Sequence, residues 1–300
     1  MANEPTLIVI TGATASGKSA LAIDLAQHLN CEIISADSRQ IYRDIPIGTA
    51  APTASQLAAV PHHLVGTLAL DAYYSAAQFE ADALAIANRL WQQSPHVIVC
   101  GGSMMYIDAL TDGIDMLPTI SEATRARVLQ MLQQQGLDAL LAYLEILDPE
   151  YYAIVDHANT RRVVHAIEIC LEAGKPYSQL RVKHHQPRPF RIVKVAMDMP
   201  RAQLFDRINR RVDIMMEEGL LEEAQRVYPL RHLNALNTVG FKELFAHFDG
   251  TMDLSTATAR IAKNTRVYAK KQLTWLARPG VRPTTFLPAD NALQTLIAML

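Results

Sequence analysis

Eight consecutive residues near the start of the chain have the spacing of a phosphate-binding loop, or P-loop. They are Gly12, Ala13, Thr14, Ala15, Ser16, Gly17, Lys18 and Ser19, and they match the pattern G-x-x-x-x-G-K-[ST]. The glycines allow the backbone to fold around an anion with its N–H groups turned inward. Lys18 adds a mobile positive charge, and the Ser19 hydroxyl can join the coordination shell of Mg2+. We therefore expect this loop to bind a diphosphate-bearing small molecule.

A single carboxylate follows the next strand-like run of residues. Asp37 comes directly after residues 32–36, and a parallel sheet would place it near the mouth of the P-loop. There it could accept a proton from an incoming nucleophile, a contribution typically worth about 10²–10⁴-fold in rate. It could equally be a loop aspartate that caps the following turn. The position alone supports both interpretations.

Apolar runs and helical periodicity alternate around these two motifs. Residues 7–11, 32–36 and 97–100 are predicted to be buried strands, and residues 18–29 and 82–93 are predicted to be helices. This alternating order predicts an α/β fold with a parallel sheet, whose sites lie at the carboxyl ends of the strands.

The pattern changes after Asp112. Only helical periodicity is found over residues 121–173, where Asp148-Pro149 is typical of a helix start and Gly174 of a helix end. Residues 191–197 are strand-like again, and further helices are predicted over residues 200–227 and 256–276. We therefore predict a core of residues 1–114 and 191–300, interrupted by a helical insertion of residues 115–190.

The composition is that of a globular protein without a strong overall charge. Of the 300 residues 50% are hydrophobic, the net charge is −2, and the three cysteines show neither metal-ligand nor disulfide spacing. We find no signal peptide at the start and no apolar run near the roughly 20 residues that span a bilayer. We expect a cytoplasmic protein without membrane contact, and nothing here requires more than a monomer.

Two long stretches contain no acidic residue, although the net charge is negative. Residues 173–197 contain Lys175, Arg181, Lys183, Arg188, Arg191 and Lys194, and residues 254–289 contain Arg260, Lys263, Arg266, Lys270, Lys271, Arg278 and Arg282. Such stretches suit a phosphate backbone, although a solvated helix face has the same composition. We favour a polyanionic partner.

Several further segments resemble one family, the bacterial tRNA dimethylallyltransferases, also called tRNA delta(2)-isopentenylpyrophosphate transferases. After the P-loop, the resembling segments are ISADSRQIY at 34–42, IGTAAP at 47–52, PHHL at 61–64, YSAAQF at 74–79, GGSMMY at 101–106, residues 159–168, TVGFK at 238–242 and KKQLTWL at 270–276. The resemblance covers nearly the whole chain. It implies a P-loop NTPase-like parallel sheet core with a helical insertion domain that grips the tRNA anticodon arm.

The resemblance also implies a reaction and a set of roles. The N6 amine of the adenosine just 3′ of the anticodon attacks the first carbon of dimethylallyl diphosphate, which gives N6-isopentenyladenosine and diphosphate. Mg2+ is the implied cofactor, and ATP is not the energy source. The catalytic residues would be Asp37 as general base, Lys18 and Ser103. The P-loop and Arg211 would hold the diphosphate, with Ser19 on the metal, although Arg211 could also be an exposed helix charge.

The expected tRNA contacts come from the resemblance and from the basic helix near the end of the chain. They are Asp37, Ser38, Arg39, Gln40, Ser103, Arg125, Arg161, Arg162, His165, Lys242, Lys270 and Lys271. Arg125 could instead be an ordinary helix-surface arginine. Four positions depart from the family pattern, because Ala13 replaces a proline, Ser103 a threonine, and His165 and Lys242 arginines.

Two other functional classes are compatible with part of these features. A small-molecule kinase would also use a P-loop and a strand-end aspartate, with ATP as donor. It would leave the helical insertion and the acid-free stretches unexplained. A tRNA-binding protein without catalysis would not need an intact set of Lys18, Ser19 and Asp37.

Overall fold

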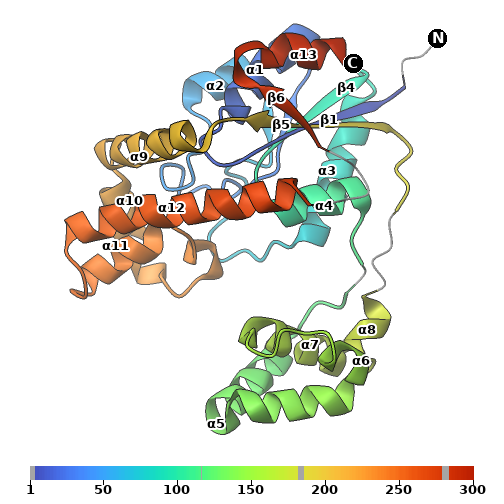
Figure 1. The fold of residues 1–300 in the computed structure, drawn as a ribbon, viewed down its shortest axis with the longest axis vertical. Helices are drawn as coiled ribbons and strands as arrows, with labels where there is room; N and C mark the ends of the chain where they lie inside the picture. Colours follow the sequence, from blue (N-terminus) through green and yellow to red (C-terminus); the bar gives the residue numbers. More distant parts are fainter. Residues whose placement is uncertain (1–3, 116, 182–185, 279–283) are drawn as a thin grey trace. The chain divides into compact units, whose positions relative to one another are not determined.

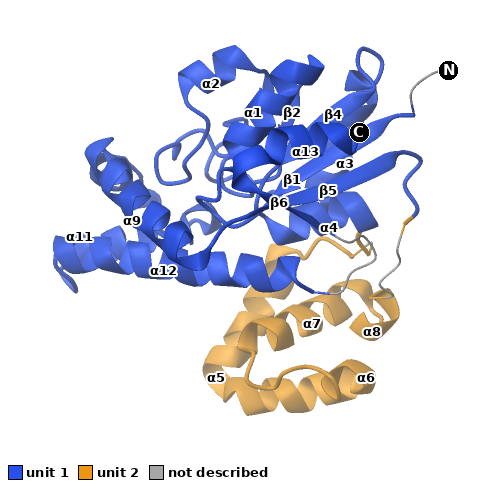
Figure 2. Cartoon of the chain, turned by 45° about the horizontal axis from the view of Figure 1, so that its top comes forward, with its two compact units in different colours: residues 1–112, 187–300 blue, residues 113–186 orange. Residues whose placement is uncertain are grey.

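The computed structural model describes residues 4–115, 117–181, 186–278 and 284–300, which form two compact units (Figure 2). Unit 1 comprises residues 1–112 and 187–300, and unit 2 comprises residues 113–186. The bounds expected from the sequence, 115 and 190, differ from these by two and four residues. Lys183 and Arg282, both counted among the basic residues of the acid-free stretches, lie outside the described residues.

A parallel sheet of six strands is the centre of unit 1 (Figure 1). Its strands are β1 (Thr6–Thr11), β2 (Ile33–Ser35), β3 (His62–His63), β4 (His96–Cys100), β5 (Arg191–Asp198) and β6 (Thr285–Pro288). They lie in the order β3-β2-β4-β1-β5-β6, and every neighbouring pair is parallel. The order places β1 and β2 on either side of β4, so the loops after all three strands meet at one edge. The predicted α/β class with a parallel P-loop core is confirmed.

Helices cover both faces of this sheet. The α-helices described in unit 1 are α1 (Lys18–Leu29), α2 (Ala54–Ala59), α3 (Ala76–Leu90), α4 (Met104–Asp112), α9 (Arg201–Glu217), α10 (Leu220–Val227), α11 (Phe241–Phe248), α12 (Leu254–Leu276) and α13 (Ala292–Ala298). One face packs on α3, α4 and the end of α12, in a core that includes Phe79 and Trp275. The other packs on α1 and α13, around Leu25 and Leu296. Burial of these apolar faces stabilises the unit.

The remaining helices of unit 1 form a second core beside the sheet. Val212 of α9, Leu220 of α10, Phe241 of α11 and Ile261 of α12 are buried together with Ile45 from the loop after β2. Short 3₁₀ helices at Tyr228–Leu230, Asn234–Leu236 and Ala289–Asn291 complete the unit. This packing places α9 and α12 against the P-loop, where Ala13 is buried with Leu204, Ile208 and Ala269.

Unit 2 is helical in the residues that the structure describes. Its helices are α5 (Glu122–Leu147), α6 (Pro149–Tyr152), α7 (Thr160–Ala173) and α8 (Tyr177–Leu180). Asp148 caps α6 by accepting a hydrogen bond of 3.0 Å from the Tyr151 N–H, as its sequence position predicts. Gly174 ends α7 in the left-handed conformation, which also agrees with the sequence.

Three details of the predicted elements are wrong or incomplete. Helix α3 begins at Ala76 rather than at residue 82, because Ser75 and Gln78 form a capping box that the apolar periodicity does not reveal. The helix predicted over residues 200–227 is interrupted at Gly219, between α9 and α10. Arg188, expected on a basic surface, has a side chain only 6% exposed and pairs with Glu80.

Candidate functional site

The P-loop connects β1 to α1 and turns its backbone around an open space. Gly17 precedes the helix with a φ of 99°, a conformation that glycine adopts at no steric cost. The Lys18 side chain folds back over the loop, with Nζ 3.4 Å from the Ala13 carbonyl oxygen. The start of α1 and the loop amides therefore surround a position suited to an anion.

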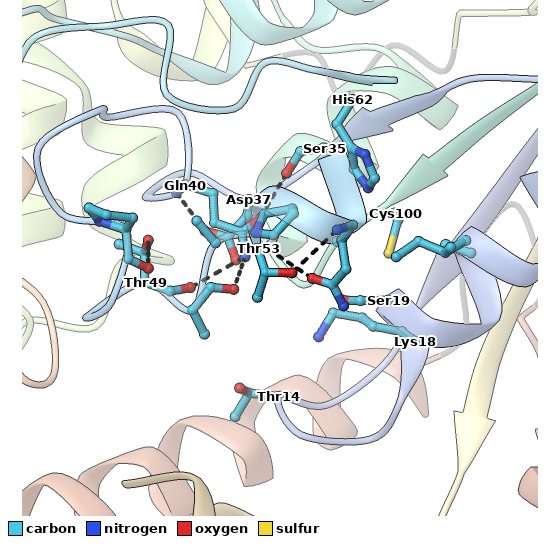
Figure 3. Close-up of a pocket in the computed structure, with 18 of the residues that line it drawn as sticks. Thr14, Lys18, Ser19, Ser35, Asp37, Gln40, Thr49, Thr53, His62 and Cys100 are labelled. Atoms are coloured by element: carbon cyan, nitrogen blue, oxygen red, sulfur yellow. Dashed lines mark hydrogen bonds between the residues drawn. The ribbon is translucent and has the colours of Figure 1, made fainter. Parts of the chain in front are cut away.

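A cavity of about 560 Å³ lies over this loop. Lys18, Ser19, Asp37 and Arg211 all line it, so the structure brings together residues that are up to 193 positions apart. Figure 3 shows Lys18, Ser19 and Asp37 around the same space, with Cys100 above the lysine in this view. The opposite wall is the loop of residues 46–54, which contributes mainly small and apolar side chains.

Two cations face this cavity, and neither lies within ion-pair distance of a carboxylate, although Asp37 lines the same space. Neither Lys18 nor Arg211 forms an ion pair within 4.0 Å in the part of the chain that the structure describes. Desolvation lowers the pKa of Lys18 and outweighs the opposing effects of Cys100 and Asp37, while the nearby Arg211 lowers it as well. Burial likewise lowers the pKa of Arg211, whose guanidinium lies 3.4 Å from the Thr14 hydroxyl. Two desolvated positive charges of this kind favour a bound anion.

Asp37 uses only one of its two carboxylate oxygens within the protein. Its Oδ1 accepts hydrogen bonds from the backbone N–H groups of Arg39 and Gln40, at 2.9 and 3.3 Å. No hydrogen bond reaches Oδ2 from the residues that the structure covers. The turn-capping interpretation is therefore confirmed, while the role of the other oxygen as a proton acceptor stays a prediction.

Ser103 lies beside the turn that carries Asp37. Its hydroxyl accepts a hydrogen bond of 2.8 Å from the Ser38 N–H and lies 3.2 Å from the Ser38 hydroxyl. Ser103 is only 9% exposed, at the start of α4. The ends of β2 and β4 are thereby fixed to each other at the edge of the cavity.

Gln40 and Arg39 have partners inside unit 1. The Gln40 amide accepts from Ser35 and donates to the carbonyl oxygens of Thr49 and Ala50, at 3.3 and 2.9 Å. Gln40 therefore holds the wall loop of the cavity. The Arg39 guanidinium donates to the Asn234 carbonyl oxygen at 3.0 Å, and both residues remain partly exposed. Their predicted tRNA contacts stay predictions.

Two residues near the cavity were missed by sequence reasoning. The Arg207 guanidinium lies beside Gly17, where its two terminal nitrogens are 3.7 and 3.9 Å from the position of an added Cβ. Glu223 is buried and accepts from the N–H groups of Ile47 and Gly48, at 2.9 and 2.7 Å. Arg207 lies one helical turn before Arg211, a spacing that could have indicated it. Nothing in the sequence indicated the partners of Glu223.

The predicted contacts in unit 2 share one buried carboxylate. Arg125 of α5 and His165 of α7 lie 3.7 and 4.0 Å from the two oxygens of Glu168, whose side chain is 7% exposed. Burial raises the pKa of Glu168 and lowers that of His165. Arg161 and Arg162 are exposed near the start of α7. Of the four predicted tRNA contacts in unit 2, Glu168 therefore orients Arg125 and His165.

The remaining predicted contacts lie on helices of unit 1. Lys242 is exposed at the start of α11, and Lys270 and Lys271 are exposed on α12, where the Lys270 ammonium lies 5.7 Å from the Phe205 ring centroid. The stretch 173–197 is a less suitable surface than expected. Besides the buried Arg188, Arg191 donates to the carbonyl oxygens of Leu300 and Met299 at 2.8 and 2.6 Å.

The donor set of the cavity fits Mg2+. The Ser19 hydroxyl and the Asp37 carboxylate, both hard oxygen ligands, line the same space. No group of three or more His, Cys, Asp or Glu residues is arranged for a metal among the described residues. Mg2+ is usually held by one or two protein oxygens, water and substrate phosphates, so this limited set is sufficient. No helix in the described ranges has the length and hydropathy needed to cross a membrane.

Comparisons with known proteins agree with this site. The family model of the IPP transferases matches residues 40–279. The chain is 56% identical over 273 residues to a tRNA dimethylallyltransferase 1 of Phocaeicola vulgatus, which covers 91% of each chain, and 52% identical to one of Bacteroides thetaiotaomicron, over 91% of this chain and 89% of the other.

Solved structures give the same result. The crystal structure of the full-length tRNA isopentenylpyrophosphate transferase of Bacillus halodurans is 32% identical, with a TM-score of 0.71 and coverage of 99% of this chain and 95% of the other. A eukaryotic dimethylallyltransferase acting on tRNA is 25% identical, with a TM-score of 0.82 and coverage of 98% and 77%. The resemblance inferred from the motifs is confirmed, and the chain belongs to the IPP transferase family.

Proposed function

We propose that this chain transfers the dimethylallyl group of dimethylallyl diphosphate to the N6 amine of the adenosine just 3′ of the tRNA anticodon. The observation that carries this proposal is the shared cavity of Lys18, Arg211 and Asp37. The two cations suit the leaving diphosphate, and the free Asp37 oxygen suits a proton from the attacking amine. The names of the related proteins and their action on tRNA support the same assignment.

In this reaction one bond forms and one bond breaks at the first carbon of the donor. The N6 nitrogen attacks that carbon, and the carbon–oxygen bond breaks with its electron pair going to the diphosphate. Asp37 Oδ2 accepts the proton that the nitrogen loses. Lys18 and Arg211 stabilise the negative charge that grows on the diphosphate, where their effect is greatest in the transition state.

Mg2+ would be held by the Ser19 hydroxyl together with oxygens of the diphosphate, and it would neutralise part of the leaving charge. The remaining role of the chain is to position the adenine. A stacked adenine cannot reach the cavity, so it must be turned out of the anticodon loop, at a cost of a few kcal/mol. Ser38, which follows Asp37, and Ser103, which accepts a hydrogen bond from its N–H, are suited to hold the displaced base.

The tRNA would be held through contacts in both units. Arg125, Arg161, Arg162 and His165 supply them in unit 2, and Lys242, Lys270 and Lys271 in unit 1, all of them exposed. The backbone phosphates supply most of the affinity in such a complex, which makes binding salt-dependent. We place the reaction in the cytoplasm, as three buried free cysteines suit a reducing compartment. We propose a monomer, which light scattering would test.

A transfer assay separates this function from the alternatives. The protein is incubated with radiolabelled dimethylallyl diphosphate and an unmodified tRNA that has adenosine next to the anticodon. We expect label in the tRNA, and no label when guanosine replaces that adenosine, because guanine carries no N6 amine. Label in the guanosine-substituted tRNA would contradict the assigned nucleophile. Phosphorylation of a small alcohol from ATP, without label transfer, would instead establish a kinase.

A further inference from the structure

We propose that Gln272 is a positioning residue for this transfer reaction, and that its amide fixes the P-loop to the segment that carries Ser103. The proposal rests on the proposed function and assigns a residue that touches neither the diphosphate nor the adenine. Gln272 lies on α12, the helix that also carries Lys270 and Lys271, and it is 2% exposed.

Both ends of the Gln272 amide have a partner in the site. The Oε1 atom accepts a hydrogen bond of 2.8 Å from the Thr14 N–H of the P-loop. The Nε2 atom donates a hydrogen bond of 2.9 Å to the Gly102 carbonyl oxygen. In Figure 3, Thr14 lies on the loop directly over a helix drawn in the pale red of this part of the chain. A single side chain therefore connects the loops that follow β1 and β4.

Gly102 has the residue type that this connection requires. A Cβ added at Gly102 would lie 2.3 Å from Gln272 Nε2, so any other residue would displace the amide. Tyr268, one helical turn earlier on α12, reaches the same carbonyl oxygen with its hydroxyl at 3.4 Å. Helix α12 can approach Gly102 this closely because glycine has no side chain.

The connection continues to both reacting groups. On one side, Thr14 also receives the Arg211 guanidinium on its hydroxyl at 3.4 Å. On the other side, Gly102 precedes Ser103, whose hydroxyl holds the Ser38 N–H at 2.8 Å, next to Asp37. Gln272 therefore lies between the diphosphate side and the proton-accepting side of one cavity. A loss of either hydrogen bond would change the distance between donor carbon and attacking amine.

The chemistry of the amide explains why this position needs glutamine. One end must accept a hydrogen bond from a backbone N–H and the other must donate a hydrogen bond to a carbonyl oxygen. Methionine has a similar volume but would supply neither bond, so the part-buried Thr14 N–H would lose its acceptor and the Gly102 carbonyl oxygen would keep only the Tyr268 hydroxyl at 3.4 Å. A carboxylate can accept but cannot donate, whereas a protonated carboxylic acid can do both. Glutamate at this position should therefore function only while it is protonated.

The test measures single-turnover transfer, with saturating dimethylallyl diphosphate and tRNA, for Gln272→Met and Gln272→Glu. We expect Gln272→Met to lower the transfer rate about tenfold or more, because a small displacement of the donor carbon from the attacking amine raises the reaction barrier. Its tRNA affinity should stay within about twofold of wild type, since phosphate contacts dominate binding. For Gln272→Glu we expect a rate that falls with rising pH, relative to wild type, as the carboxylic acid loses its proton.

The control is Thr274→Ala, an exposed residue of the same helix, which should leave the rate unchanged. A purely structural role would lower the melting temperature and leave the rate of the folded protein and its pH profile at wild-type values. That result would overturn the proposal. Combining Gln272→Met with Ser103→Ala gives a second readout, because a shared connection predicts a combined loss well below the product of the single losses. A combined loss equal to the product of the two single losses would also overturn the proposal.

Two further comparisons keep the result decisive. If Gln272→Met fails to fold, Gly102→Ala tests the same connection from the other side, since its Cβ would displace Nε2, and a wild-type rate there would contradict the proposal. Failure of the proposed function is a separate outcome. In that case wild-type protein itself would transfer no label, whereas failure of the Gln272 proposal leaves transfer by the wild-type protein intact.

Discussion

Ser103 Oγ accepts a hydrogen bond of 2.8 Å from the backbone N–H of Ser38, the residue that follows Asp37. This contact joins the ends of two neighbouring strands and fixes the turn that presents the Asp37 carboxylate. It makes the position of Asp37 depend on a residue that lies 65 positions away in the chain.

Replacing Ser103 should therefore affect both the turn and the reaction. Ser103→Ala leaves the Ser38 N–H without its acceptor, which costs about 1–3 kcal/mol at a part-buried position. We expect a lower melting temperature and a reduced transfer rate. Ser103→Thr keeps the hydroxyl and should retain most of the activity. Equal rates for the alanine variant and wild type would remove Ser103 from the catalytic set.

Asp37 can be tested without destroying its turn. Asp37→Asn keeps an oxygen that accepts the N–H groups of Arg39 and Gln40 but removes the proton acceptor. We expect transfer to fall by about 10²–10⁴-fold, with tRNA affinity and melting temperature near wild type. Asp37→Ala removes both functions and should also destabilise the turn. Near-normal single-turnover rates for Asp37→Asn would show that another group accepts the proton.

Lys18 predicts a pH dependence of diphosphate binding. Desolvation holds its pKa below the ordinary value of 10.5, so the free protein loses this charge at a lower pH than an exposed lysine would. Only the protonated form attracts the anion, and affinity for dimethylallyl diphosphate should fall as the pH rises through that lowered pKa. Isothermal titration calorimetry between about pH 7 and pH 10 measures this affinity.

The matched control for this dependence is Lys18→Arg, which stays charged throughout the range. The affinity of Lys18→Arg for dimethylallyl diphosphate at each pH is compared with its own affinity at neutral pH, and not with that of wild type, because the shape of the side chain also changes. The alkaline loss of affinity should disappear in Lys18→Arg. An alkaline loss of equal size in both proteins would assign the titration to another group.

Glu223 holds the wall of the cavity from α10. Glu223→Gln replaces one acceptor oxygen by an amide nitrogen and leaves a backbone N–H of Ile47 or Gly48 unpaired, at a cost of about 1–3 kcal/mol. Burial raises the pKa of Glu223, so the folded state binds a proton more readily than the unfolded state. Its contribution to the free energy of unfolding therefore falls as the pH rises from 4.5 towards the raised value.

Denaturant unfolding of wild type and Glu223→Gln across this pH range measures that contribution. The difference in free energy of unfolding between the two proteins should change with pH in the direction just given, because glutamine does not titrate. A difference that is constant from acid to neutral pH would contradict the assignment of the raised pKa to Glu223.

The basic residues of α12 should contribute to tRNA binding through phosphates. Reversing Lys270 and Lys271 to glutamate should weaken binding and lower the slope of log affinity against log salt by about one for each lost contact. Arg231→Glu is the control, since Arg231 is exposed in unit 1 on the segment after α10. A slope that is unchanged in the double variant would place the tRNA elsewhere.

The sequence by itself determined the features that depend on neighbouring residues. The P-loop could be identified because its glycines, lysine and serine act through one continuous turn of backbone. The helix over residues 18–29 and the caps at Asp148 and Gly174 could be predicted for the same reason. The succession of motifs was specific enough to indicate the family, which the comparisons confirm.

Only the tertiary structure decided which distant residues share the site. Periodicity shows that a helix has an apolar face, but it does not specify the partner of that face. The packing of α9 and α12 on the P-loop brings Arg211 and Gln272 to Thr14. Arg188 shows the opposite outcome, as a charge expected on the surface is buried against Glu80. These assignments depend on long-range burial, which no local pattern of residues records.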